Sequence, residues 1–410
     1  MHQPKIQRRI TSEGITVKFQ YRSRPRILAA LGVAAAITTV LAGCSGGLGG
    51  GGDAGDDSGP IKLGMIAPYS GSESAFGVYM ENGAQMAVDE INEAGGIDGR
   101  ELELITEDGA CDATTAVAAA NKLVTEGVIG SVGGYCSGAT LPTLPVFGDA
   151  NIPMVIPAAN SNELVAQGLK HVFLINGTGT QQAAAAVKYA TKIGAEKVAV
   201  LNDNTSYSKD LATSFVTQSE EAGAYEVVLD QSVNAGEKDY SANVNNVVGA
   251  SPDFVYWTGY YQEGGLIARQ LQDAGFTGTM LVGDGSVDKT FTEIAGEGYT
   301  DKVFATFTQT PDMLEGAETW VADYQERYDA EPGPYSTQAY DAVRVMAEAI
   351  GSAGSTDGDE LIAALEAIDG LELFSGPLKF TSDHTLSAGG FAILKIAGDG
   401  TFILEDDLQD

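Results

Sequence analysis

Short apolar runs alternate with longer amphipathic stretches along the chain from Ile61 onward. Residues 61–68 (IKLGMIAP) and 100–108 (RELELITED) have the length and composition of strands. Between them, residues 83–96 place apolar side chains at i, i+3, i+4 and i+7 and end in two glycines, which is typical of an amphipathic helix. The chain therefore begins its folded part with a strand, a helix and a second strand.

The same alternation continues to about residue 308. It predicts further strands at 128–134, 152–157, 171–176, 197–203, 225–233, 253–259, 279–284 and 302–308. It predicts helices at 112–127, 140–150, 180–194, 208–223, 240–250, 265–275 and 291–296. Strands separated by helices pair in parallel through right-handed crossovers, so the pattern predicts an α/β protein with two doubly wound, parallel-sheet (Rossmann-like) lobes.

The last hundred residues depart from this alternation. Apolar periodicity predicts three successive helices at 315–330, 335–354 and 359–370. Residues 391–405 then read as two short strands that turn at AGDG, the signature of an antiparallel hairpin.

The first 43 residues carry a different pattern. Seven basic side chains and a single acid, Glu13, accompany the 16-residue apolar run Ile27–Ala42. This run is short for a bilayer span and follows a basic segment, which predicts a secretory signal peptide over residues 1–43.

The signal ends in LAGC, Leu41 to Cys44, and a glycine-rich stretch follows. LAGC resembles the bacterial lipobox, whose cysteine becomes the lipidated first residue of the mature protein. We therefore expect lipidation of Cys44, a flexible tether over residues 44–60 and a protein held at the outer face of the cell membrane. A plain signal peptide with an incidental cysteine is the alternative.

The charge balance limits the partners. Removing seven basic groups and one acid from totals of 23 and 56 leaves 16 basic and 55 acidic side chains, a net charge near −39. A protein with this negative charge repels nucleic acid and anionic lipid headgroups. We therefore expect no nucleic-acid partner, and no membrane contact except through the lipid.

Two cysteines remain beside Cys44. In an exported protein the pair Cys111 and Cys136 predicts one disulfide, closing a loop of about 25 residues.

Catalytic and metal-binding patterns are missing from the sequence. The three histidines, His2, His171 and His384, are scattered singly and have no metal-ligand spacing. No strand is followed by a phosphate-binding loop, a nucleophile elbow or a dinucleotide glycine motif. We therefore expect no catalytic residue, no metal and no cofactor.

Ligands of parallel sheets bind beyond the carboxyl ends of the strands. Here the loop Gly133–Pro142 (GGYCSGATLP) offers Ser137, and the loop Pro157–Leu164 (PAANSNEL) offers Asn160, each at the start of a helix. Hydroxyls and amides at helix starts suit a small carboxylate. Taken singly, each loop is explained better as an ordinary N-cap.

Other strand-end loops supply aromatic side chains and an acid. Phe76, Tyr207, Tyr260 and Tyr335 suit a pocket that packs on an apolar ligand group, although buried aromatic residues more often belong to a core. Asp284 ends the strand LVGD and could pair with an ammonium group or cap the next helix.

Several segments taken together resemble a known family, the type I periplasmic binding proteins that deliver leucine, isoleucine and valine to ABC importers. The likeness extends from Ile61 to Leu404 and is carried by SGSESAFG, GAQMAVDEINEAGGIDG, CDATTAVAAANKLV, CSGAT, PAANSNEL, AGEKDYS, DFVYWTGYYQEGGLIARQ and GPLKF. It implies two lobes joined by a three-strand hinge that close over a solute, which a permease then receives.

The resemblance also implies roles for single residues. It pairs Cys111 with Cys136 and gives the ligand carboxylate to Ser137. It implies backbone contacts to the ligand from Ala158 and Ala159. It indicates Tyr207 or Tyr260 as the residue of the opposite lobe that closes over the ligand. Phe76 and Tyr335 would form the walls of the side-chain pocket.

Two positions depart from the family pattern. Asp284 stands where an ammonium-binding glutamate is usual, and Asn160 stands where a threonine is usual. Both departures weaken the prediction that the ligand is leucine. They weaken the prediction that it is an amino acid less.

The resemblance places three crossings between the lobes, near Asn176, Thr308 and Ser375. The expected domains are the signal peptide 1–43, the tether 44–60, lobe 1 at 61–176 and 308–375, and lobe 2 at 177–307 and 376–410.

The sequence thus predicts a monomeric, extracytoplasmic, lipid-anchored binding protein of an ABC importer, with a branched-chain or otherwise apolar amino acid as ligand. An amide, urea or aromatic acid as ligand, a sensor subunit without transport, and a hydrolase on an α/β scaffold are the alternatives.

Overall fold

The computed structural model describes residues 59–296, 298–308, 311, 314, 316–387 and 390–408. The expected signal peptide, the lipidation site Cys44 and the tether up to residue 58 lie outside the described residues. From Pro60 onward the chain contains a five-stranded and a seven-stranded sheet, and each sheet with its helices forms one lobe.

Lobe 1 is built on a five-stranded parallel sheet with the order β2-β1-β3-β4-β5. Its strands are β1 (Ile61–Ala67), β2 (Leu102–Asp108), β3 (Gly130–Ser131), β4 (Met154–Ile156) and β5 (Val172–Leu174). The strands β3, β4 and β5 are buried throughout, as expected for a sheet that is covered on both faces.

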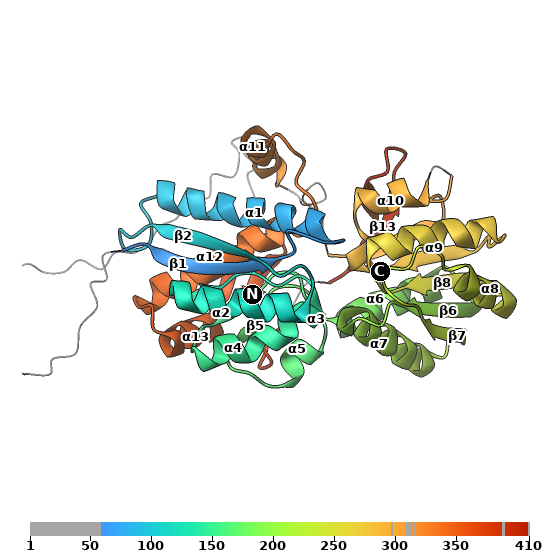
Figure 1. Ribbon diagram of the computed structural model, residues 1–410, viewed down its shortest axis with the longest axis horizontal. Coiled ribbons are helices and arrows are strands. Elements are labelled where there is room, and N and C mark those ends of the chain that lie inside the picture. The colour runs from blue at the N-terminus through green and yellow to red at the C-terminus, as the bar shows by residue number, and fades with distance from the viewer. Residues whose placement is uncertain are drawn as a thin grey trace, which may run out of the picture. The chain divides into compact units, whose positions relative to one another are not determined.

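Helices cover both faces of this sheet (Figure 1). They are α1 (Ser74–Glu93), α2 (Ala113–Glu126), α3 (Ser137–Thr140), the 3₁₀ turn η1 (Leu141–Thr143), α4 (Leu144–Asp149), α5 (Glu163–Ala166), α11 (Glu318–Tyr328), α12 (Ser336–Ala353) and α13 (Gly358–Glu366). The packing of α1 on α12 is close, because a Cβ atom at Gly83 would lie 2.0 Å from the carbonyl oxygen of Ser336. A helix predicted early in the chain is therefore covered by one that follows 240 residues later.

Lobe 2 repeats the strand order of lobe 1 and adds a hairpin. Its seven-stranded sheet has the order β14-β13-β10-β9-β8-β6-β7, in which β13 and β14 are antiparallel. The strands are β6 (Lys197–Asn202), β7 (Glu226–Ser232), β8 (Phe254–Trp257), β9 (Thr279–Val282), β10 (Val303–Phe307), β13 (Ala392–Ile396) and β14 (Phe402–Asp406). The helices are α6 (Gly179–Lys192), α7 (Ser206–Ala222), α8 (Ser241–Ala250), α9 (Tyr261–Asp273), the 3₁₀ turn η2 (Asp284–Ser286) and α10 (Lys289–Ala295).

Local signals in the sequence set several helix ends. Asp112 caps α2 by accepting a hydrogen bond from the Thr115 amide at 2.8 Å, and Gly127 ends the helix with a φ of 78°. Thr178 and Gln181 form a reciprocal capping box that starts α6 just beyond the first crossing between the lobes.

The third crossing lies later in the chain than the sequence predicts. Strand β11 (Asp369–Leu373) turns at residues 374–375 into β12 (Gly376–Lys379), forming a small separate hairpin. Beyond it, the Leu174 amide donates to the His384 carbonyl at 2.9 Å, and the His384 ring stacks on Phe173 at a centroid distance of 4.1 Å. Residues 376–387 thus stay with lobe 1, and the chain reaches the second sheet at β13 rather than near Ser375.

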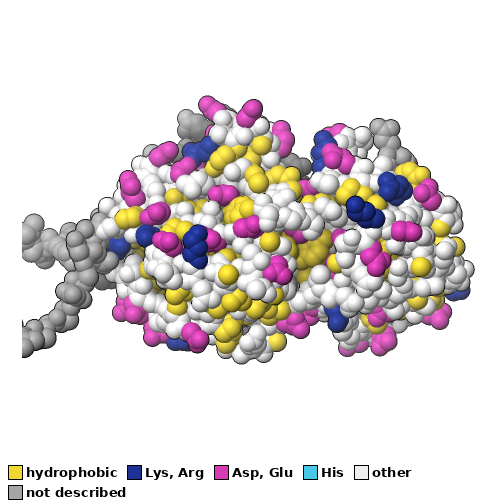
Figure 2. Space-filling model, in the orientation of Figure 1, with side chains coloured by type: hydrophobic (Ala, Val, Ile, Leu, Met, Phe, Trp, Pro, Cys, Tyr) yellow, Lys and Arg dark blue, Asp and Glu magenta, His cyan; other side chains and the backbone are white. Residues whose placement is uncertain are grey.

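The visible surface carries many acidic side chains and fewer basic ones (Figure 2). This agrees with the formal net charge of −33 for the whole sequence. Among the described helices, none combines the length and the apolar character that crossing a membrane requires.

Candidate ligand-binding site

Both lobes direct the same kind of loop toward the candidate site. In a sheet with the order 2-1-3-4-5, the crossover connections leave the first and third strands on opposite sides, which opens a crevice at their carboxyl ends. In lobe 1, Phe76 and Ser137 lie in the first turns of the helices that follow β1 and β3. In lobe 2, Tyr207 lies in the first turn of the helix after β6, and Tyr260 immediately precedes the helix after β8. The topology therefore explains why these positions are candidates.

Asp284, which follows β9, joins the two lobes. Tyr207 of its own lobe donates to Oδ1 at 2.6 Å, while Asn160 of lobe 1 donates to Oδ2 at 3.3 Å. The Tyr335 hydroxyl, also from lobe 1, donates to Oδ2. Asn160 donates in addition to the side-chain oxygen of Gln182 at 2.9 Å. One carboxylate thus collects three side-chain donors from segments far apart in the sequence.

The burial of Asp284 determines its protonation. Its side chain is 4% exposed, and this burial raises the pKa of the carboxyl group, while the bonds from Tyr207 and Tyr335 lower it in part. Burial, together with the charge of Asp284, also raises the pKa of both phenols, so they act as donors.

Tyr335 is held in an unusual backbone conformation. Its φ of 66° and ψ of 2° lie in the left-handed region, immediately before the first residue of α12. This conformation costs a non-glycine residue on the order of 1 kcal/mol and occurs more often at functional sites than elsewhere. The strain aims the hydroxyl of a buried side chain at Asp284.

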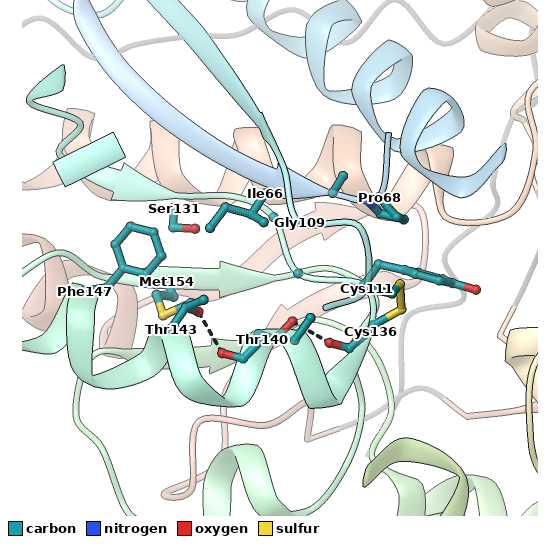
Figure 3. Close-up of a pocket in the computed structure, with 15 residues that line it drawn as sticks. Ile66, Pro68, Gly109, Cys111, Ser131, Cys136, Thr140, Thr143, Phe147 and Met154 are labelled. Carbon is teal, nitrogen blue, oxygen red and sulfur yellow. Dashed lines mark hydrogen bonds between the residues drawn. A yellow bond between two sulfur atoms is a disulfide. The ribbon is translucent and has the colours of Figure 1, made fainter. Parts of the chain in front are cut away.

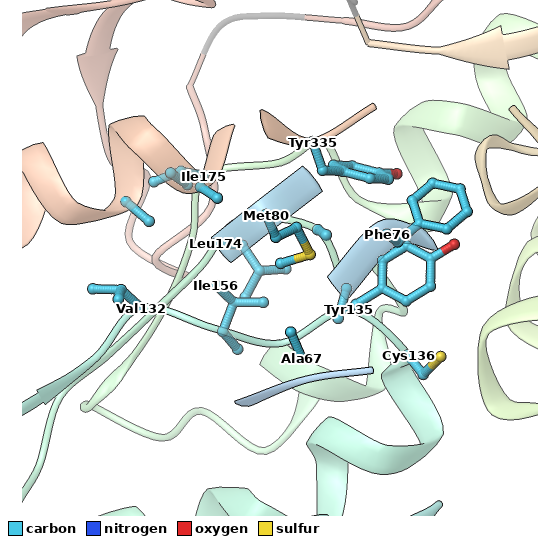
Figure 4. Packing of buried hydrophobic residues seen from close by; sticks show 14 of the residues in the cluster. Ala67, Phe76, Met80, Val132, Tyr135, Cys136, Ile156, Leu174, Ile175 and Tyr335 are labelled. Atoms are coloured by element: carbon cyan, nitrogen blue, oxygen red, sulfur yellow. The ribbon is translucent and has the colours of Figure 1, made fainter. Parts of the chain in front are cut away.

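Aromatic rings surround this carboxylate. Phe76 and Tyr135 stack at a centroid distance of 4.5 Å, and Tyr135 meets Tyr335 at 5.8 Å and Tyr260 at 6.1 Å. Tyr260 in turn lies 5.3 Å from Tyr207. Figure 4 shows Phe76, Tyr135 and Tyr335 grouped beside the apolar core of lobe 1. The rings form a wall suited to an aliphatic group.

The turns predicted to hold a carboxylate lie next to each other. The Ser161 amide donates to the hydroxyl oxygen of Ser137 at 3.2 Å, which leaves the hydroxyl proton free to point elsewhere. The Ala159 amide donates to the Gly134 carbonyl at 3.0 Å, and the Asn176 side chain donates to the Ala158 carbonyl at 2.7 Å. Both backbone groups expected to meet a ligand thus have protein partners in this structure, so their role stays a prediction.

The disulfide holds one of these turns. Cys111 and Cys136 are bonded, with their Cα atoms 5.4 Å apart, and Cys136 immediately precedes Ser137. Figure 3 shows the bond at a small pocket behind the turn, whose volume of about 20 Å³ has room for about one water molecule. Cys136 is a structural cross-link here rather than a nucleophile.

The structure brings together six of the nine predicted ligand residues through side-chain contacts. They are Phe76, Asn160, Tyr207, Tyr260, Asp284 and Tyr335. Ser137, Ala158 and Ala159 lie on the neighbouring turns described above.

Sequence reasoning missed three residues of this region: Glu73, Tyr135 and Asp203. They are 3%, 7% and 2% exposed, and each has a side-chain oxygen without a hydrogen-bond partner among the described residues. Glu73 and Tyr135 stand inside stretches that were singled out, SGSESAFG and GGYCSGATLP. The sequence signal that could have identified them is a large polar side chain, Glu73 or Tyr135, within a stretch of mostly small residues.

No group of three or more His, Cys, Asp or Glu side chains in the described part of the chain is arranged to hold a metal ion. The described side-chain partners of Asp284 are the hydrogen-bond donors Asn160, Tyr207 and Tyr335.

Known proteins resemble the chain over most of its length. The family model described as periplasmic binding protein matches residues 60–401. A Leu/Ile/Val-binding protein of Rhizobium johnstonii is 36% identical over 342 residues, covering 82% of this chain and 91% of that protein.

Solved structures resemble the fold over most of the chain. The crystal structure of a leucine-binding protein from Thermotoga maritima has a TM-score of 0.77 at 30% identity, covering 84% of this chain and 97% of that one. A branched-chain amino acid transporter substrate-binding protein from Streptococcus pneumoniae, in complex with isoleucine, has a TM-score of 0.75 at 28% identity, covering 84% of this chain and all of that one. These relatives are solute-binding proteins rather than enzymes, in line with the expectation from the sequence.

Proposed function

Because the chain belongs to the periplasmic binding protein family, we propose that it is the lipid-anchored solute receptor of an ABC importer and binds an amino acid between its lobes. The ligand has a side chain that packs on aromatic rings, as a branched-chain or other apolar side chain does. The protein acts as a monomer outside the cytoplasm and hands the amino acid to the permease.

The observation that carries the proposal is the convergence of both lobes on Asp284. The bonds from Asn160 and Tyr335 cross from lobe 1 to a carboxylate of lobe 2. An ammonium group has three donors and a positive charge, so it can bind this carboxylate and offset the cost of burying it. Ligand binding and lobe closure would then depend on the same side chain.

The opposite end of the ligand fits the neighbouring turns. A carboxylate accepts hydrogen bonds only, and the Ser137 hydroxyl carries a donor for it, whereas Asn160 already donates to Gln182 and Asp284. The described atoms around Asp284 include no lysine or arginine side chain as a partner. A zwitterion fits such a site better than an anion, which would face the buried acid without a positive group.

Delivery to a membrane permease is supported by the N-terminal signals. LAGC at Leu41 to Cys44 and the glycine-rich stretch after it suit a lipid anchor with a flexible tether. A tether of fifteen such residues has a mean end-to-end distance of roughly 20 Å, which lets the folded part move above the membrane.

The test is a binding screen of the purified full-length chain in detergent, after removal of bound solute by unfolding and refolding. Thermal unfolding is followed with each of the twenty amino acids, acetamide, urea and benzoate. An amino acid at a hundred times its dissociation constant is expected to add about 2.7 kcal/mol to the free energy of unfolding. A response to acetamide, urea or benzoate with none to any amino acid would overturn the proposal.

A further inference from the structure

Within the described part of the chain, three oxygen atoms near the aromatic wall are buried without hydrogen-bond partners. They are Oε2 of Glu73, the Tyr135 hydroxyl and Oδ2 of Asp203. Glu73 and Tyr135 come from the loops after β1 and β3, and Asp203 from the loop after β6. Leaving a polar group buried and unpaired costs about 1–3 kcal/mol, and more for a charged one. Three such atoms at the crevices of the two sheets therefore call for a shared explanation.

These atoms are neighbours. The charge of Glu73 is the strongest electrostatic influence on Tyr135, and the charge of Asp203 is the strongest on Tyr260. The rings of Tyr135 and Tyr260 lie 6.1 Å apart. Oδ2 of Asp203 is also close to the chain before Tyr260, because a Cβ atom at Gly259 would lie 2.6 Å from it. Glu73 and Asp203 thus each act on one ring of the Tyr135–Tyr260 pair.

The charged groups that act on Glu73 are acidic. Burial raises the pKa of its carboxyl group, and Glu263, Asp203 and Asp288 raise it further, while a hydrogen bond with the Ser72 side chain lowers it in part. The described groups that shift the pKa values of Glu73 and Asp203 include no lysine or arginine. The repulsion between these buried carboxylates is reduced if they keep their protons or if a positively charged group binds beside them.

We propose that Glu73, Tyr135 and Asp203 form a second subsite, which binds a positively charged nitrogen at the far end of the ligand's side chain. The ligand class is then an α-amino acid whose aliphatic stem packs on the rings, as an apolar side chain does, but ends in an ammonium or guanidinium group. This replaces the wholly apolar side chain named in the proposed function and keeps its amino-acid frame. This proposal rests on the proposed function, because it assumes that the α-ammonium group binds Asp284.

The chemistry of such a ligand matches the whole region. Its aliphatic stem packs on Phe76, Tyr135 and Tyr260, and the charged end gains further from the faces of the rings. A terminal ammonium carries three donors, one for each unpartnered acceptor. A purely apolar side chain would leave all three acceptors unpaired.

The experiment uses ligand pairs of equal stem length. Calorimetry of the full-length chain compares L-lysine with L-norleucine and L-ornithine with L-norvaline. At least one charged ligand is expected to bind at least ten times more tightly than its apolar partner. Hydrogen bonds to charged groups contribute enough binding free energy for such a ratio. Equal or tighter binding of the apolar ligand in both pairs would overturn the inference. Failure of every amino acid to bind would instead overturn the proposed function.

Variants assign the selectivity to the subsite. Glu73→Gln keeps the size of the side chain and removes its charge, and is expected to lower the ratio of charged to apolar affinity at least tenfold. Glu101→Gln removes one charge from an exposed position of the same lobe and should leave the ratio unchanged. Tyr135→Phe removes a single oxygen and gives the same direction of change if Glu73→Gln fails to fold. An unchanged ratio in the folded variants would refute the assignment.

The pH dependence of the affinity ratio distinguishes two explanations of the buried acids, namely that they bind a cation or that they keep their protons. The acids that face the subsite are Glu73 before α1, Asp203 after β6, Glu263 in α9, Asp284 after β9 and Asp288 before α10. Burial raises the pKa values of Glu73, Asp203, Glu263 and Asp284, so raising the pH favours their charged forms. Between pH 5 and 8 the affinity for lysine or ornithine should therefore rise relative to that for the apolar partner. A ratio that falls with pH would contradict the proposal.

Discussion

Asp284 combines two properties that rarely occur together, full burial and a position between two lobes. The pKa of its carboxyl group is raised mainly by burial, which means that burial disfavours the charged form. Its bonds to Asn160 and Tyr335 nevertheless connect lobe 2 to lobe 1. A ligand ammonium at this point would favour the charged form and closure at the same time.

Replacing this carboxylate should affect binding far more than folding. For Asp284→Asn, we expect the dissociation constant of the bound amino acid to rise about 30-fold, equivalent to about 2 kcal/mol. The free energy of unfolding without ligand should not fall, because the variant removes a charge whose burial is unfavourable. Calorimetry and chemical denaturation measure the two effects.

Asp301→Asn is the matched control, since Asp301 is an exposed acid of the same lobe. It should change neither quantity. A change in affinity below threefold for Asp284→Asn would remove this residue from the site.

Sequence reasoning found Asp284 but not Glu73, and the difference is physical. Asp284 ends a strand, so its place at the edge of a parallel sheet follows from the local pattern. Glu73 stands in a loop of small residues, where a glutamate is ordinarily solvated. Its burial depends on the opposite lobe, for example on the Tyr261 hydroxyl, which donates to the Ser72 carbonyl. A contact across 189 positions leaves no trace in the local sequence.

At the scale of elements, the Cys111–Cys136 disulfide ties the start of α2 to the start of α3. The bond joins residues 25 apart, and the turn it holds carries Ser137. It therefore limits the freedom of the unfolded chain and fixes one wall of the candidate site.

Removing this cross-link should cost about 3 kcal/mol of the free energy of unfolding, from the entropy of closing a loop of this size. The double variant Cys111→Ser with Cys136→Ser tests this in a denaturant titration under non-reducing conditions. Wild-type protein measured with a reductant should show the same loss. Equal stability of all three samples would show that the bond contributes nothing.

The boundaries of elements were predicted unevenly. Strands and helices up to β10 follow the apolar pattern closely, but α1 begins at Ser74, well before the predicted start at residue 83. Phe76 and Met80 continue its buried face, whereas glycines at 77 and 83 obscure the helical pattern. The β11–β12 hairpin was not predicted, because its strands are short and carry little alternation. For that reason the third crossing was placed too early.

At the scale of the whole molecule, buried acids should make stability depend on pH. Asp341 in α12 is 2% exposed, accepts from Arg344 at 2.7 Å and from the Phe374 amide at 2.8 Å, and yet burial raises its pKa to about 6. Between about pH 4 and 6 the folded state then holds a proton that the unfolded state has released.

The free energy of unfolding should therefore fall as the pH rises from 4 to 6, by up to about 3 kcal/mol from this group alone, and level off above. The variant Asp341→Asn should flatten the decline, as measured by denaturant titrations of the ligand-free chain at several pH values.

Asp359→Asn is the control for this decline. The bond and charge of Lys170 lower the pKa of Asp359, so above about pH 5 this acid is ionised in both states and its loss should not alter the slope there. A wild-type stability that rises through the window would contradict the assignment to buried acids.

The architecture of two lobes was predictable because it follows from alternation, which is a local property repeated many times. The closed contact between the lobes was not, because it depends on pairs such as Asn160 and Asp284, 124 positions apart. The sequence thus indicates where ligand-facing loops lie, and the structure shows which of them meet.

The placement of α12 and of the β13–β14 hairpin has a consequence for biosynthesis. The buried face of α1 is covered by residues 336–353, and β10 gains its outer neighbour only at residues 392–396. While a ribosome is still producing the middle of the chain, each half lacks a piece that is encoded near the end. Expression of lobe 1 alone would thus require a rearranged gene in which residues 60–176 are joined directly to the segment around 336–387.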